Sequence, residues 1–275
     1  MKNNKRLLFS VCGFAGGAAG ALLAELVPNF GLGLVPLVAN TTLWSAVGAA
    51  LITVALFAAG EIYNRKKFSF GIYRKGVVAG VIAGAVGGFV AQAVYSFQGE
   101  PNFFNQVIFR SFCWAIMGGL LGWRLSAVVP NLGSSRGIIA GAIGGFVGGI
   151  GFLASSMIFA EVLGRMVGFG VLGAALGLAV VAIEEMFRAA RLDVIWAPKE
   201  ITSVTLGAKP VFIGGGDDHI FIDGLPQHAL GVILENGKIQ CIDNATGNRS
   251  DLKEGSRIQI GKVEVVVRTK ADVDS

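Results

Sequence analysis

Runs of glycine and the two histidines are the first places where this sequence could carry chemistry. Gly214, Gly215 and Gly216 could cradle a phosphate, but the run leads from one strand-like segment into another. It has no helix and no Lys-Ser/Thr pair after it, so nucleotide binding is not predicted. His219 and His228 lack a cysteine or carboxylate partner at ligand spacing, so no metal site is predicted.

Serine and cysteine residues supply no catalytic group either. Ser155 and Ser156 lie in an apolar segment, with no histidine available to act as a base. Cys12, Cys113 and Cys241 show neither metal-ligand nor redox spacing, which is typical of buried free thiols. The sequence therefore predicts a protein that is not an enzyme and that holds no metal or cofactor.

A few polar residues lie inside apolar segments, where they could serve a transport path. Glu25 and Gln92 come late in their segments, whereas Arg110 and Arg165 begin theirs, so all four are expected near the same membrane interface. No charge falls near the centre of a segment, which argues against a proton relay. We expect Arg110 or Arg165 to pair with Glu25 or Glu161 and to set the helix register.

The composition indicates which kinds of structural element hold these residues. The chain has 275 residues, 53% of them apolar and only 15% charged, with 41 glycines, whereas soluble domains are about 25% charged. Residues 1–198 carry a net charge of +7 and residues 199–275 carry −2. This division excludes a single soluble domain, a disordered chain and a disulfide scaffold. The basic excess belongs to the apolar part, so nucleic-acid binding is not predicted.

Six segments are long and apolar enough to cross a bilayer, which takes about 20 residues. They cover residues 7–27, 42–62, 76–97, 107–129, 137–160 and 165–183. Loops with Lys and Arg alternate with loops that lack them, so both termini are expected in the cytoplasm. The sequence thus predicts a multi-pass transmembrane domain over residues 1–183, and the short loops suit a bacterial inner membrane. The tryptophans near span ends are expected to be interface anchors: Trp44, Trp114, Trp123 and Trp196.

Glycines in these segments repeat at constant offsets. One set recurs at an offset of 61, the partner helices match at an offset of 55, and the first segment is a weaker copy at an offset of 67. An all-α six-helix bundle of three helical-hairpin repeats is therefore predicted. Spacing by four places the glycines on one helix face, where they let two backbones pack closely; the alternative is a glycine-lined pore. The predicted packing positions are Gly76, Gly80, Gly84, Gly88, Gly118, Gly122, Gly137, Gly141, Gly145, Gly149, Gly173 and Gly177.

The residues after the last apolar segment, called the tail here, have a different sequence pattern. Residues 184–198 are predicted to be a juxtamembrane helix and linker that ends at Pro198, and residues 199–275 an all-β sandwich. Asn236-Gly237 is a strong hairpin signal. The expected strands cover residues 203–206, 211–213, 220–222, 229–234, 238–242, 257–260 and 263–268.

Within the tail, a series of short motifs resembles a known family. The motifs are Val211-Phe212-Ile213-Gly214, Asp218-His219-Ile220-Phe221-Ile222, His228-Ala229, Asp243, Leu252, Glu254-Gly255, Ile258 and Ile260-Gly261. Their order and spacing over residues 202–269 resemble a degenerate forkhead-associated (FHA) domain. No family is assigned to the membrane half.

The resemblance implies a β-sandwich that binds peptides through loops at one end, with Gly214 and His228 in structural roles. Gly215 stands where the family has a phosphate-binding Arg, and Leu225 stands where it has a Ser. Binding is therefore not expected to depend on phosphothreonine, although Arg249 could supply a cation from another loop. The expected protein-contact residues are Gly215, Gly216, Asp217, Leu225, Pro226, Gln227, Thr246, Asn248 and Arg249.

These observations predict a membrane anchor or adaptor. The bundle contacts the lipid bilayer and presents the FHA-like module to a cytosolic protein, in signalling or in the assembly of a membrane complex. A homo-oligomer is compatible with the sequence. The alternative is a channel or transporter component whose tail is a regulatory domain, because internal repeats are common in transporters.

Overall fold

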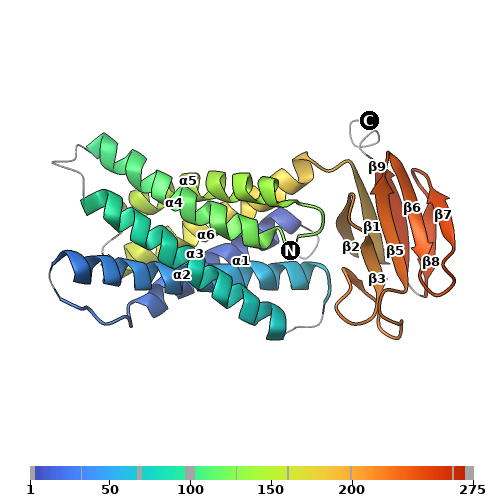
Figure 1. The fold of residues 1–275 in the computed structure, drawn as a ribbon, viewed down its shortest axis with the longest axis horizontal. Coiled ribbons are helices and arrows are strands. Elements are labelled where there is room, and N and C mark those ends of the chain that lie inside the picture. The colour runs from blue at the N-terminus through green and yellow to red at the C-terminus, as the bar shows by residue number, and fades with distance from the viewer. Residues whose placement is uncertain are drawn as a thin grey trace.

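A computed structural model describes residues 4–31, 33–66, 70–96, 103–127, 129–159, 161–198, 200–261 and 263–269. An elongated helical bundle occupies one end of the molecule and a β region the other (Figure 1). The helices are α1 (Lys5–Ala24), α2 (Leu34–Tyr63), α3 (Phe70–Ser96), α4 (Phe103–Leu125), α5 (Ser134–Ile158) and α6 (Glu161–Met186).

Five of these helices are long and apolar enough to cross a membrane: α1, α2, α3 over Tyr73–Val94, α5, and α6 over Val162–Met186. The chain is therefore a multi-pass integral membrane protein with a C-terminal β domain. The predicted span over residues 107–129 corresponds to α4, which is not among the five. That helix carries Arg110 and Arg124 near its two ends, and it runs alongside the other helices (Figure 1).

The helices form a closed ring in which each glycine-rich helix packs on the preceding hairpin. A Cβ added at Gly84 of α3 would overlap the carbonyl oxygen of Ser45 in α2. In the same way α5 meets α4, and α1 meets α6, where Gly13 lies against the backbone of Gly173. The glycines thus join one hairpin to the next, and the contact between α1 and α6 closes the ring.

The centre of the bundle is formed by the second helix of each hairpin. Trp44, Trp114 and Phe169 occupy equivalent positions in α2, α4 and α6, and the Phe169 ring lies 4.6 Å from Trp44 and 5.2 Å from Trp114 between centroids. Trp44 and Trp114, which are expected to be interface anchors, both pack on Phe169 and are partly buried. Leu56, Leu121 and other fully buried side chains fill the same core.

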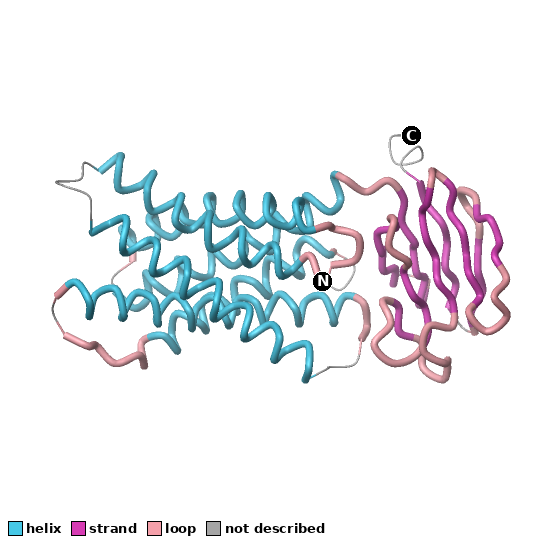
Figure 2. The backbone as a smooth tube through the Cα atoms, viewed as in Figure 1, coloured by secondary structure: helices cyan, strands magenta, loops and turns pink. Residues whose placement is uncertain are grey.

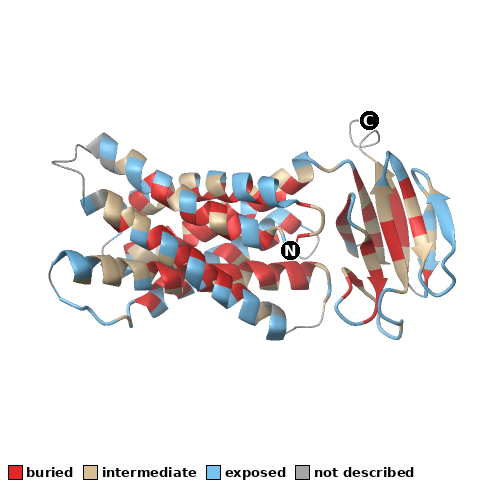
Figure 3. Ribbon diagram, in the orientation of Figure 1, coloured by how far each residue is buried: buried red, intermediate tan, exposed pale blue. Residues whose placement is uncertain are grey.

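The β region consists of two sheets (Figure 2). One has the order β2-β1-β9-β8 and the other β4-β3-β5-β6-β7. The inner faces of the two sheets share one apolar core. Along the strands, residues that face this core alternate with more exposed residues on the outer faces (Figure 3). The strands are β1 (Ala190–Ala197), β2 (Glu200–Leu206), β3 (Val211–Gly214), β4 (Ile220–Phe221), β5 (Leu230–Glu235), β6 (Lys238–Asp243), β7 (Arg249–Leu252), β8 (Arg257–Ile260) and β9 (Val263–Thr269).

The predicted juxtamembrane helix and linker over residues 184–198 is wrong for most of its length. Helix α6 ends at Met186, and Ala190–Ala197 forms β1 in the interior of the first sheet, paired with β2 and β9. Leu192 and Val194 are fully buried while Arg191 and Asp193 point to the other face. This period of two belongs to a strand, so the β domain begins before Pro198.

Candidate functional site

Three loops meet at one end of the β domain, as the sequence predicts. They connect β3 to β4, β4 to β5 and β6 to β7. The buried Asp218 carboxylate accepts a hydrogen bond from the backbone N–H of His228 at 2.7 Å. The Asn244 amide donates to the carbonyl oxygen of His228 at 2.6 Å, and its backbone N–H donates to Ala229 at 3.2 Å. These bonds join the three loops into one surface.

Gly214 and Gly215 lie where two backbones approach closely. A Cβ at Gly214 would stand 2.5 Å from the carbonyl oxygen of Pro226, and one at Gly215 would overlap the carbonyl oxygen of Leu225. No side chain fits at either position. Gly215 is buried, so the contact surface of this loop is formed by the exposed Gly216 and Asp217.

His228 holds the loops together instead of facing a ligand freely. Its backbone has a φ of 57°, and its ring pairs with the Asp218 carboxylate. The ring also lies 4.3 Å from that of Phe212 between centroids. Besides Gly216 and Asp217, the predicted contact residues exposed at this end are Pro226, Gln227, Thr246, Asn248 and Arg249.

A cavity of about 450 Å³ opens beside these loops. Leu225, Pro226 and Gln227 line one side, whereas Thr246, Asn248 and Arg249 lie outside its wall. Asp243 ends β6 on the opposite side, where its carboxylate accepts from the N–H of Ala245 at 2.9 Å. Hydrogen bonds from Ala245 and Thr246 lower the pKa of Asp243, so this carboxylate stays charged near neutral pH.

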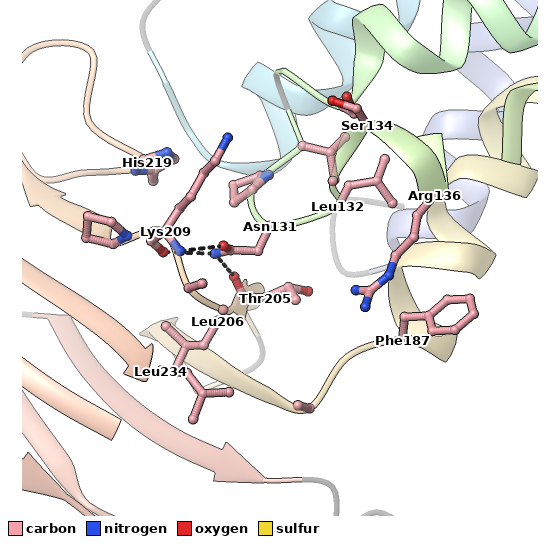
Figure 4. A pocket seen from close by; sticks show the side chains of 18 of the residues that line it. Asn131, Leu132, Ser134, Arg136, Phe187, Thr205, Leu206, Lys209, His219 and Leu234 are labelled. Carbon is pink, nitrogen blue, oxygen red and sulfur yellow. Dashed lines mark hydrogen bonds between the residues drawn. The ribbon is translucent and has the colours of Figure 1, made fainter. Parts of the chain in front are cut away.

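A larger cavity, of about 770 Å³, lies at the junction between the helices and the β domain (Figure 4). The α4–α5 connection, the first turn of α5, the residues after α6 and the β2–β3 connection form its walls. Asn131 closes one side, because its side-chain amide donates to the carbonyl oxygens of Thr205 at 3.1 Å and Lys209 at 3.2 Å. We call this space the junction cavity.

His219 forms part of the junction cavity wall as a neutral group. Its Nδ1 accepts a hydrogen bond from the backbone N–H of Phe212 at 3.1 Å, which requires that nitrogen to be unprotonated. Burial, and to a lesser degree Lys66, lowers the pKa of His219 to about 4. The imidazole is therefore uncharged at physiological pH.

Strand β2 attaches the β domain to the bundle through polar contacts. The N–H of Ser203 donates to the Tyr63 hydroxyl at 2.9 Å. The buried Glu184 carboxylate accepts from the Thr205 hydroxyl and from the Lys5 ammonium, both at 2.5 Å. Sequence reasoning missed this cluster because its members are far apart in the chain, and only the placement of Glu184 directly after an apolar segment gave a signal.

At the opposite end of the bundle, one predicted ion pair is confirmed. The Arg165 guanidinium donates two hydrogen bonds to the Glu25 carboxylate, at 2.7 and 2.9 Å. Gln92, at the position equivalent to Glu25, accepts from the Thr41 hydroxyl at 3.1 Å. The Glu161 side chain lies outside the described residues.

Two adjoining cavities open at this same end. They have volumes of about 380 and 360 Å³, and both are lined by Thr41, Trp44 and Phe152. Arg165 lines the first and Arg110 the second. The walls are mainly apolar, with polar groups near the outer end.

Among the described residues, no group of three or more His, Cys, Asp or Glu side chains could hold a metal ion. Comparisons of the chain with protein-family models, with curated proteins and with solved structures find no match.

Proposed function

We propose that this protein is a membrane anchor that presents an FHA-like interaction domain to a cytosolic protein partner, in signalling or in the assembly of a membrane complex. The observation that carries this proposal is the attachment of the β domain through β2. Ser203 and Thr205 are occupied by contacts with the bundle, whereas the loop residues Gln227 and Asn248 are exposed. The domain is held in place with the 224–228 and 246–249 loops open, whereas the carbonyl oxygen of Asp217 in the β3–β4 loop accepts a hydrogen bond from Lys66 at 3.4 Å.

The orientation follows from charge. The helix ends that meet the β domain carry Lys5, Arg6, Arg65, Arg136 and Arg188. Lys and Arg concentrate on the cytoplasmic side of membrane proteins, which supports a cytoplasmic β domain. It also requires α4 to cross the bilayer as a sixth span, in agreement with its position alongside α5, where Gly118 lies against Gly141.

Loss of the family's phosphate-binding residues supports recognition that does not depend on phosphothreonine. The resemblance places an Arg at position 215, and here the carbonyl oxygen of Leu225 occupies the space that any side chain there would need. The partner would then contact the apolar and amide groups of the 224–228 loop and the 246–249 loop.

Photocrosslinking tests this proposal. A photoreactive amino acid at Gln227 or at Asn248 of the full chain, expressed in cells, should yield the same discrete crosslinked protein. The matched control is Lys238, which is equally exposed but begins β6 at the opposite end of the strands. Equal crosslinking at Lys238, or none at either loop position, would contradict the proposed contact surface.

One observation favours a second function, that of a channel or transporter component with the β domain as regulator. The two adjoining cavities bring polar groups into the outer half of the bundle. Below them, however, Leu56, Leu121 and Leu176 are completely buried in the core, so a solute path requires these side chains to move. Solute-dependent flux in liposomes containing the purified chain would establish this alternative and displace the anchor proposal.

A further inference from the structure

The junction cavity has a basic lining with no acidic residue. Arg136, from the first turn of α5, and Lys209, from the β2–β3 connection, are the two charged side chains among the residues that line it. Neither has a carboxylate partner among the described residues, although most other basic side chains near the β domain do. Lys5, Arg65, Arg188, Arg191 and Arg268 all pair with Asp or Glu.

The two cations belong to different parts of the molecule. Arg136 lies between Leu132 and Phe187, with its guanidinium 4.8 Å from the centroid of the Phe187 ring, whereas the Lys209 side chain starts beside Asn131 and its ammonium points away from Arg136 (Figure 4). Phe187 holds the planar guanidinium in place while leaving its N–H groups available. Both cations line the same cavity, so an anion bound there is attracted by each of them.

The remaining walls suit a ligand that is partly polar and partly apolar. Ser134 and Ser135 contribute hydroxyl groups, whereas Val129, Pro130 and Leu132 contribute apolar surface on the membrane side. His219 stays neutral in the wall, and because its Nδ1 already accepts from Phe212, its Nε2–H can donate a hydrogen bond without adding charge. The volume of about 770 Å³ lies within the range of about 300–1,000 Å³ that small-ligand sites occupy.

We propose that the junction cavity binds a phosphate group, supplied by the headgroup of an anionic phospholipid, and that this group draws the β domain toward the bundle. The inference rests on the proposed orientation, which places the cavity at the headgroup level of the cytoplasmic leaflet. That leaflet is rich in anionic lipid, and basic pockets between helices on that side bind lipid headgroups. Arginine recognises phosphate through paired N–H donors, and Lys209 supplies a second charge from the β domain.

The test uses the purified full chain in a neutral detergent. Thermal unfolding is followed while a short-chain phosphatidylglycerol is added, with phosphatidylcholine of the same chain length as the zwitterionic control. Glycerol phosphate, which carries the same phosphate without acyl chains, forms a third arm. The phosphatidylglycerol should raise the unfolding midpoint in a saturable manner, and phosphatidylcholine should not.

Variants identify the site. Arg136→Gln and Lys209→Gln should each weaken the apparent affinity for phosphatidylglycerol about fivefold, and the double variant about 30-fold, as expected for roughly independent basic residues near a charged lipid surface. Arg124→Gln and Lys238→Gln remove the same charge from exposed positions outside the cavity. They should stay within about twofold of the unmodified chain, because exposed charges that do not contact the bound phosphate are largely screened by salt. The unfolding midpoint without lipid shows whether each variant is folded.

Comparison of the three added compounds distinguishes a lipid phosphate from a soluble phosphate, and it shows which results would contradict the inference. Saturation by phosphatidylglycerol alone identifies the lipid headgroup, whereas an equal effect of glycerol phosphate that is lost in the double variant identifies a soluble phosphate in the same site. Equal effects of both lipids, or an unchanged affinity in the double variant, would overturn the inference. If the unmodified chain showed no saturable response to phosphatidylglycerol while crosslinking at Gln227 was retained, the inference would be overturned without affecting the proposed function.

Discussion

Single residues at the outer end of the bundle connect the last helix to the first. Glu25 and Arg165 form a two-bond pair that joins α1 to α6, the contact at which the ring of hairpins closes. The side chains are partly exposed, so the pair itself contributes roughly 1 kcal/mol or less. Its position makes it a sensitive reporter of ring closure.

A charge exchange tests the role of this pair. Glu25→Arg places two guanidinium groups in contact and should lower the unfolding midpoint in detergent, because like charges at that distance repel. Adding Arg165→Glu restores opposite charges and should recover most of the loss. Failure of the exchange to recover stability, with both single variants folded, would show that the pair does not set the helix register.

The His219 ring makes the stability of the fold depend on pH. Its pKa is 6.5 when unperturbed and about 4 in the folded chain, so between these values the unfolded chain binds more protons than the folded one. Stability must therefore fall as the pH drops from about 6.5 toward 4. His219→Asn keeps an acceptor for the N–H of Phe212 and removes this titration. Tryptophan fluorescence across that pH range should show a shallower loss of stability in the variant, and an unchanged slope would contradict the assigned pKa.

The packing of helix faces can be tested at two neighbouring glycines of α4, Gly118 and Gly119, which differ in the space beside them. A Cβ at Gly118 would overlap the backbone of Gly141 in α5, whereas one at Gly119 would have 3.6 Å to its nearest neighbour, the carbonyl oxygen of Ile138. Gly118→Ala should cost about 1–3 kcal/mol through overpacking. Gly119→Ala should be neutral or should stabilise by up to about 1 kcal/mol through helix propensity. Equal unfolding midpoints for the two variants would refute the close contact.

The repeated hairpins can be predicted from the sequence: the constant offset between Gly80 and Gly141 reveals them, because helical periodicity is local. The offset does not reveal that Gly141 faces Gly118 of the preceding hairpin, since partner choice depends on how the repeats close into a ring. The contact of Trp44 with Phe169 is hidden in the same way, because the two residues are more than a hundred positions apart in the chain.

In the β domain, too, local features can be predicted from the sequence, whereas features that depend on distant contacts cannot. The Asn236-Gly237 hairpin and the apolar runs of β5 and β6 are visible in the sequence, because turn residues and alternation are local signals. Strand β1 was missed because Arg191 and Asp193 resemble the polar exit of a membrane helix, and its strand character becomes clear only through pairing with β2 and β9. The loops between the strands could be located from the sequence, whereas the junction cavity could not, because Arg136 and Lys209 line one cavity only in the folded molecule.

At the scale of the whole molecule, three distant segments meet at one buried ion pair. Lys5 begins α1, Glu184 lies near the end of α6, and Thr205 of β2 donates to the same carboxylate. Only residues 187–189 separate α6 from β1, so this cluster and the short connection together fix the β domain against the bundle. Both side chains of the pair are buried, which makes the loss of one partner costly.

Glu184→Gln leaves the Lys5 ammonium buried without a counter-charge, and should destabilise the docked state by about 3–5 kcal/mol. The β domain should then swing away more often and expose Arg188, so trypsin should release it faster. The adjacent pair, Arg6 with Glu185, joins the same two helices but is solvent-exposed, so Glu185→Gln should cost roughly 0–1 kcal/mol. Lys5→Met combined with Glu184→Gln removes both charges and should slow the cleavage again. If Glu185→Gln accelerated cleavage as much as Glu184→Gln, charge at the helix end in general, and not the buried pair, would hold the β domain in place.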